Sequence, residues 1–297
     1  MRWTLWIVLG LFPLIDGHPT LKTDQNSLET ADAALNHQNG SLNSVLHLDD
    51  TEKAALETTR NDPAFPMKEL NTSHYPATRA AKVAQHYLNY HHGSPFKWFM
   101  VHAVKKASSE DIPEVGKKYH IQFSVQEQAT KEIVGNCTAE ILFRHTEVQS
   151  APEVNCTCDD LLKIKTSDAD HALYHHIKHQ PEPMTGMDIP DSHGNIPKEM
   201  EPFWYLGGIG ASFIMWQQSN ESTLYNMAHV HSVKQLNSEN DLLAFEYVVL
   251  LHDMVSQEII HWHMQVAWNP TQGVKVTQCH LLPKGTLKQP SAEKHKI

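Results

Sequence analysis

Several familiar features are missing from this sequence of 297 residues. It holds 24 basic against 34 acidic residues, and no basic block reaches the density that phosphate backbones require, so nucleic acid is not an expected partner. After the N-terminal segment, no apolar run approaches the roughly 20 residues that span a bilayer. The motifs G-x-G-x-x-G, G-x-S-x-G and H-E-x-x-H are all absent. These absences argue against a dinucleotide-binding enzyme, a serine hydrolase and a zinc protease.

The N-terminus has the pattern of a secretory signal. Arg2 precedes an apolar run from Trp3 to Ile15, and Gly17 offers a small residue for cleavage. Five N-x-Ser/Thr sequons follow, at Asn39, Asn71, Asn136, Asn155 and Asn220. We therefore expect a secreted, extracellular glycoprotein with a signal peptide at 1–17 and no membrane span after its removal; the alternative is that the segment is retained as an anchor.

Cysteine is scarce, with only four in the chain: Cys137, Cys156, Cys158 and Cys279. An even number in a secreted chain predicts disulfides in one of three connectivities. The C-x-C spacing alone is a weak zinc signal, because no second cysteine pair stands at ligand spacing.

The composition divides the chain. Residues 18–70 hold nine acidic and four basic residues without sustained periodicity, which predicts a largely disordered acidic extension. Residues 284–297 form a basic tail that we expect to be flexible.

A helix followed by four strands is predicted twice between these ends. The first helix begins near Pro76, and its strands cover 96–106, 117–126, 136–144 and 152–158. The second helix covers 202–216, and its strands cover 224–233, 242–252, 257–268 and 273–282. Similar letters at 102–111 and 231–241 indicate a duplication. We expect an α+β fold of two units, 71–159 and 186–283, each with a helix cradled by a curved antiparallel four-stranded sheet.

A linker segment, 160–185, joins the two units. Ser167 and Asp170 fit a capping box, which predicts a connecting helix that ends before Pro181.

The 22 histidines raise the question of a metal site. His229 and His231 share one side of a strand, as do His261 and His263, and the linker helix aligns three more, His171, His175 and His179. Solvated histidines are ordinary on outer faces, and no catalytic zinc motif is present. We expect no resident metal, no cofactor and no enzymatic activity.

The hairpin from Val248 to Trp268 is the most suggestive feature. Large apolar residues alternate along both of its strands and predict a rigidly anchored pair. Between them lies a polar-tipped segment, His252-Asp253-Met254-Val255-Ser256-Gln257. A fixed projection loses little freedom on docking, which favours a binding role over a simple polar turn.

These residues resemble the latexin family. The resemblance covers roughly residues 72–285, including YPATRAAKVAQHYLNYHHGSP (75–95), NCTAEILF (136–143), APEVN (151–155), IPDSHGNIPKEM (189–200) and LLHDMVSQEIIHWHMQVAW (250–268). It implies two tandem cystatin-like subdomains joined by the linker helix, and inhibition of A-type metallocarboxypeptidases. It also implies that both subdomains face the rim of the enzyme's funnel and that His252 and Gln257 approach the enzyme's zinc. Residues Asp253 to Ser256 would supply the shape of the contact.

Two other functions are kept open. Secreted relatives include an eggshell protein, so the acidic extension suggests an extracellular matrix or mineral-associated protein. A cystatin-type inhibitor of cysteine proteases would need Q-x-V-x-G, and the nearest segment, KEIVG at 131–135, lacks the glutamine. Under each of these readings we expect a monomer.

Overall fold

The computed structural model describes residues 66–146, 148–159, 164–237 and 241–285. The predicted signal peptide, the extension up to residue 65, the sequon at Asn39 and the tail from residue 286 lie outside the described residues.

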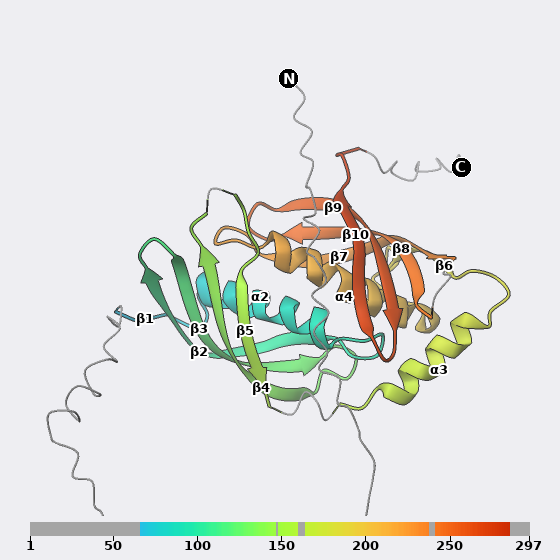
Figure 1. Ribbon diagram of the computed structural model, residues 1–297, viewed down its shortest axis with the longest axis horizontal. Helices are drawn as coiled ribbons and strands as arrows, with labels where there is room; N and C mark the ends of the chain where they lie inside the picture. Colours follow the sequence, from blue (N-terminus) through green and yellow to red (C-terminus); the bar gives the residue numbers. More distant parts are fainter. Residues whose placement is uncertain (1–65, 147, 160–163, 238–240, 286–297) are drawn as a thin grey trace, which may run out of the picture. The chain divides into compact units, whose positions relative to one another are not determined.

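Two antiparallel sheets and a small number of helices form the described chain (Figure 1). The first sheet has the order β1-β2-β3-β4-β5 and the second has the order β10-β9-β8-β7-β6. The first unit consists of β1 (Lys68–Glu69), α2 (Tyr75–His92), β2 (Phe99–Ile112), β3 (Gly116–Glu127), β4 (Ile133–Arg144) and β5 (Glu153–Cys158). The second consists of β6 (Thr185–Ile189), η2 (Lys198–Met200), α4 (Glu201–Gln218), β7 (Tyr225–Leu236), β8 (Leu243–Asp253), β9 (Glu258–Asn269) and β10 (Gly273–Leu281). The expected α+β fold is confirmed.

The expected number of strands is wrong, because each sheet has five rather than four. The added strands, β1 and β6, lie at the sheet edges and are two and five residues long. Lys68 and Glu69, which the sequence placed in the acidic extension, pair with Ser109 and Ser108, and Leu70 packs against the first core. The ordered unit therefore begins before residue 71.

Helix α3 (Ser167–Lys178) lies between the two units in the sequence. The predicted capping box does not form: Thr166 precedes the helix, and its Oγ1 donates a 2.7 Å hydrogen bond to Asp170 Oδ2. Ser167 Oγ instead lies 3.4 Å from His171 Nδ1.

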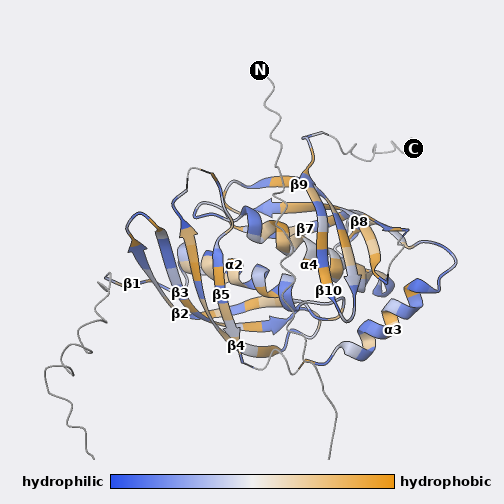
Figure 2. Cartoon of the chain, viewed as in Figure 1, coloured by the Kyte–Doolittle hydropathy of each residue, from blue (hydrophilic) through white to orange (hydrophobic). Residues whose placement is uncertain are grey.

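Helices α2 and α4 pack against each other, and each also packs on its own sheet (Figure 1). Hydrophobic and hydrophilic residues alternate along the strands (Figure 2), as expected of sheets with one buried face. Helix α4 has both a sheet and a second helix to meet, and most of its residues are buried.

Glycines in α4 make close packing possible on both sides. A Cβ on Gly207 would lie 3.0 Å from Tyr247 of the sheet, whereas one on Gly208 would lie 2.7 Å from Cζ2 of Trp98 in the first unit. Trp98 is 6% exposed, and its ring centroid lies 6.0 Å from that of Trp204. Small residues thus let the sheet approach α4 closely, and one of them also seats the first unit's tryptophan.

One disulfide joins Cys137 and Cys158, which are directly opposite on β4 and β5. Cys156 and Cys279 are free. Burial raises the pKa of the Cys156 thiol to about 12 and also raises the pKa of Cys279. Of the three predicted connectivities, only the one that pairs Cys137 with Cys158 and Cys156 with Cys279 contains this bond. Its second bond is not formed in the structure.

A buried histidine also links the two units. His86 of α2 is 2% exposed, and its Nε2 lies 3.1 Å from the carbonyl oxygen of Tyr225 in β7. A carbonyl only accepts, so Nε2 carries the proton. Burial, with a smaller effect of Lys82, lowers the pKa of His86 to about 3.

We predict that Gly208→Ala destabilises the protein by about 1 kcal/mol. Alanine favours a helix by up to about 1 kcal/mol over glycine, but overpacking a core costs about 1–3 kcal/mol. Urea unfolding measures the balance, and the penalty should shrink in a Trp98→Phe background, where the smaller ring leaves room for the methyl group. If Gly208→Ala alone stabilised the protein, as a glycine-to-alanine change does in a solvent-exposed helix, the proposed close contact would be wrong.

We predict that His86 makes the free energy of unfolding depend on pH. The unfolded chain protonates this residue near its ordinary pKa of 6.5, whereas the folded chain does so only near pH 3. Its contribution is complete above about pH 6.5 and falls by up to about 1.4 kcal/mol per unit as the pH decreases toward 3.

Chemical denaturation of His86→Gln across this range tests the effect, since glutamine can still donate to Tyr225 but does not titrate. His102→Gln, at an exposed position of β2, is the matched control. An unchanged pH slope in His86→Gln would contradict the assignment.

Candidate functional site

The hairpin of β8 and β9 is anchored as its sequence predicts. The inward residues of β8 are at most 5% exposed, and those of β9 from Trp262 onward are at most 9% exposed. They are Leu243, Phe245, Tyr247, Val249 and Leu251, followed by Trp262, Met264, Val266 and Trp268. The Tyr247 hydroxyl donates a 3.1 Å hydrogen bond to the carbonyl oxygen of Phe203, which ties the hairpin to α4. The turn at its end therefore projects from a well-packed base.

Asp253 lies inside this turn and organises it. One carboxylate oxygen accepts hydrogen bonds from the backbone N–H of Leu224 at 3.0 Å and of Val255 at 3.1 Å. The other accepts a 2.8 Å bond from the Ser256 hydroxyl. Burial raises the pKa of Asp253, but these bonds outweigh it and hold the pKa below its ordinary value.

This placement corrects the expectation that Asp253 contributes surface for a partner. Asp253 is 5% exposed, and its acceptors are already engaged by the turn and by Leu224, the residue before β7. Asp253 is a positioning residue.

The four residues after Asp253 are exposed. Met254 and Val255 are 43% and 46% exposed, so two apolar side chains stand at the tip. Gln257 adopts a left-handed backbone with φ 60°, and its N–H donates to the Asp253 carbonyl at 2.8 Å. Its side-chain amide donates a 2.6 Å bond back to the Met254 carbonyl. The tip thus presents an apolar pair beside a folded-back amide.

His252 is half-buried on the outer side of β8, where it pairs with Asn226 and Ile259 of the neighbouring strands. Among the described residues, no hydrogen bond joins His252 to Gln257. The structure places both at the base of one turn, each with its own neighbours.

The beginning of α2 lies close to this turn. The pKa of the Tyr75 hydroxyl is raised, mainly by burial. The charge of Arg79 lowers this pKa, and the charge of Asp253 has a smaller effect that raises it. Tyr75 is 38% exposed, so it extends the tip's surface onto the first unit.

Arg79 fixes this junction, although no motif in the sequence singles it out. The guanidinium is 5% exposed and donates to the Glu221 carbonyl and, at 3.2 Å, to the Tyr119 hydroxyl. That hydroxyl donates a 2.8 Å bond to the Glu221 carboxylate. Burial and Glu221 together raise the pKa of Tyr119 to about 12. The available sequence signal is that Arg79 stands one helical turn before Val83, a buried residue of the same helix.

The described sequons lie at accessible positions. Asn71, Asn136 and Asn155 are exposed, and Asn220 is half-buried beside the Glu221 junction. No described helix is long and apolar enough to cross a membrane.

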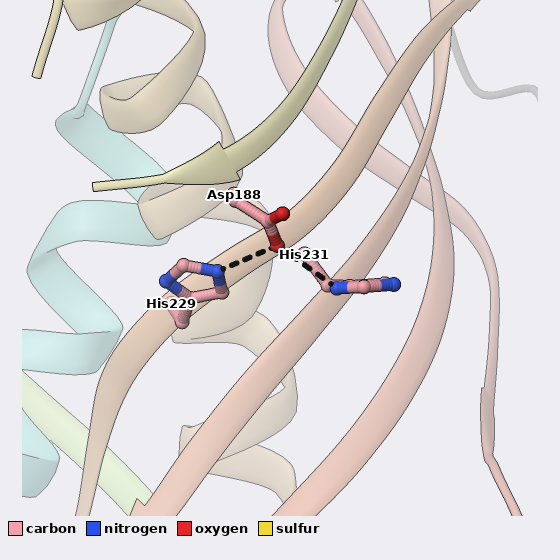
Figure 3. A group of neighbouring side chains, drawn as sticks. All are labelled: Asp188, His229 and His231. Carbon is pink, nitrogen blue, oxygen red and sulfur yellow. Dashed lines mark hydrogen bonds and ion pairs between the residues drawn. The ribbon is translucent and has the colours of Figure 1, made fainter. Parts of the chain in front are cut away.

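The histidine groups differ in what surrounds them. His229 and His231 lie 3.3 and 3.2 Å from Asp188, which the sequence did not single out (Figure 3). His263 lies 2.8 Å from Glu246 instead. On α3, His171 and His179 contact backbone carbonyls one turn earlier in the helix.

The segment nearest to a cystatin-type motif, 131–135, crosses the turn between β3 and β4 and enters β4 at Ile133. Lys131 has a left-handed φ of 59°, and Ile133 is 58% exposed.

Comparison with known proteins identifies the family. The latexin family model matches residues 70–285. Mouse latexin is 42% identical over 216 residues, which is 73% of this chain and 97% of that protein. Chicken ovocalyxin-32 is 37% identical over 211 residues, covering 71% and 76% of the two chains. The match to the crystal structure of mouse fetuin-B covers 75% of this chain and 72% of the fetuin-B chain, with 12% identity and a TM-score of 0.24. The chain belongs to the latexin family.

Proposed function

We propose that this protein is a secreted, non-enzymatic inhibitor of A-type zinc metallocarboxypeptidases that occludes the funnel leading to the enzyme's active site. The observation that carries the proposal is the turn at 254–257, which is exposed, yet clamped from within by Asp253. Membership of the latexin family supports the choice of enzyme class, through the activity that the resemblance implies.

A clamped turn suits inhibition because it loses little conformational freedom on docking. Met254 and Val255 would fill apolar space at the mouth of the funnel. The Gln257 amide, once rotated away from the Met254 carbonyl, offers both a donor and an acceptor to groups that hold a substrate's carboxylate. His252, at the other end of the turn, would approach the same region of the enzyme, and the catalytic zinc is the enzyme's own.

The start of α2 would form the second part of the contact surface. Tyr75 is exposed next to the turn, and the Arg79–Glu221–Tyr119 network holds the first unit against the loop after α4. We infer that the two helix-and-sheet units are tandem cystatin-like subdomains joined by α3, and that both meet the rim of the funnel.

Secretion and glycosylation are part of the same proposal. The signal-like residues 1–17, the sequons and the disulfide between Cys137 and Cys158 are all consistent with an oxidising compartment. Because Asn220 adjoins Glu221, a glycan there would stand near the proposed contact surface.

We predict that the full-length protein inhibits A-type carboxypeptidases and that Gln257→Ala and His252→Ala each weaken inhibition at least tenfold, about 1.4 kcal/mol. Asp253→Ala should weaken it by at least as much, although this residue does not face the enzyme, because the turn loses its internal acceptors. Inhibition constants against a panel of A-type and B-type enzymes provide the measurement.

The matched control is Gln272→Ala, which removes an exposed glutamine from the turn between β9 and β10. Consecutive turns of an antiparallel meander lie at opposite ends of the sheet, so inhibition should not change. The proposal would be contradicted if this control lost inhibition, or if the wild type failed to inhibit even after its glycans were removed. In the second case, binding of the full chain to calcium carbonate would favour the mineral-associated alternative.

A further inference from the structure

The group of Asp188, His229 and His231 has a geometry that the proposed inhibition does not use. Asp188 lies on the edge strand β6, and both histidines lie on β7 beside it (Figure 3). One ligand atom from each residue falls within 4.8 Å of the others, and among the described residues this is the one group of three that does so.

Strand pairing explains why the three side chains meet. Met187 pairs with Ser232 and Ile189 with Val230, so Asp188 faces the residue between them, His231. The register of β7 against β8 shifts between Met227 and His229 and again between Val230 and Ser232. Such bulges redirect side chains locally, and here both imidazoles reach the same carboxylate.

Asp188 also adopts an unusual backbone conformation. Its φ is 51°, in the left-handed region that is uncommon for residues other than glycine, although aspartate tolerates it better than most. Conformations of this kind are energetically unfavourable and cluster at functional sites. In this conformation the carboxylate lies against the two rings.

The two separations from Asp188 match those between ligands of a tetrahedral ion, and the two histidine nitrogens lie within 4.8 Å of each other. Asp188 Oδ1 lies 3.3 Å from His229 Nε2 and 3.2 Å from His231 Nδ1. Ligands bound to Zn²⁺ at about 2.0–2.1 Å and at tetrahedral angles lie about 3.3–3.4 Å apart. A small inward movement of the side chains would bring all three atoms to bonding distance of one ion.

We propose that Asp188, His229 and His231 bind a Zn²⁺ ion, with a fourth position open to water or to a group from a partner. Two imidazoles select zinc and neighbouring transition metals over Mg²⁺ and Ca²⁺, which prefer oxygen ligands. The histidine side chains are 24% exposed and that of Asp188 is 57% exposed, so an ion can enter directly from solvent. This inference departs from the expectation, based on the sequence, that the chain binds no metal of its own.

The test is Zn²⁺ titration of the chelator-treated full chain by calorimetry, with Co²⁺ absorption as a probe of tetrahedral coordination. We expect one tight equivalent in the wild type. Asp188→Asn and His231→Gln should weaken that equivalent at least tenfold and remove the intense visible bands of bound Co²⁺.

His263→Gln is the matched control, because His263 also lies on the outer side of this sheet and contacts a carboxylate, Glu246. Within the described part of the chain, it belongs to no group of three candidate ligands. It should leave the tight equivalent intact. If Asp188→Asn and His231→Gln bound Zn²⁺ as the wild type does, or if His263→Gln lost as much, binding would be dispersed among the 22 histidines and the site would be refuted.

A second readout covers variants that fold poorly. Zn²⁺ should raise the melting temperature of the wild type and of His263→Gln, but not of Asp188→Asn, since a ligand stabilises only the state that binds it. Equal shifts in all three proteins would also overturn the proposal. Neither readout involves a carboxypeptidase, so failure of the inhibitor proposal and failure of the metal site are distinguishable.

Discussion

The packing of α2 against α4 is the contact on which the rest of this structure depends. A sheet with one apolar face needs a cover, and each helix covers its own sheet while also burying its opposite side against the other helix. Gly208 admits the Trp98 ring, and Gly93 lies against Ile209 in the same manner. These approaches join two helix-and-sheet units into one body, so the position of the hairpin tip is fixed relative to the first unit.

Polar contacts fix the relative position of the two units more specifically than apolar burial does, because hydrogen bonds join particular atoms. His86 meets the Tyr225 carbonyl, and Arg79 meets the loop residue Glu221, so both ends of the segment leading from α4 into β7 are tied to α2. Asp253 accepts a hydrogen bond from Leu224 in that same segment. The turn is therefore held both by its own strands and, through this segment, by the first unit, which is the arrangement that a preorganised docking element requires.

Much of this fold can be predicted from periodicity alone. The ends of every long strand and of both covering helices lie within a few residues of their predicted positions, except that β2 continues to Ile112. The agreement is good because alternation along a half-buried strand and an apolar stripe along a helix are strong signals. The two short edge strands carry too few residues to show a period, and they were missed. The error at Asp253 has another cause: an aspartate in a polar turn has the same sequence pattern whether its acceptors face solvent or the turn. The Asp188 cluster was equally out of reach, because it depends on the pairing of β6 with bulges in β7.

The most direct test of the central claim is hydrogen exchange of the full chain with and without an A-type carboxypeptidase. The account predicts slower exchange at residues 252–259 and around Tyr75, with no change at the β9–β10 turn, 269–273. Inhibition accompanied by unchanged exchange at 252–259, or by protection confined to other surfaces, would contradict it.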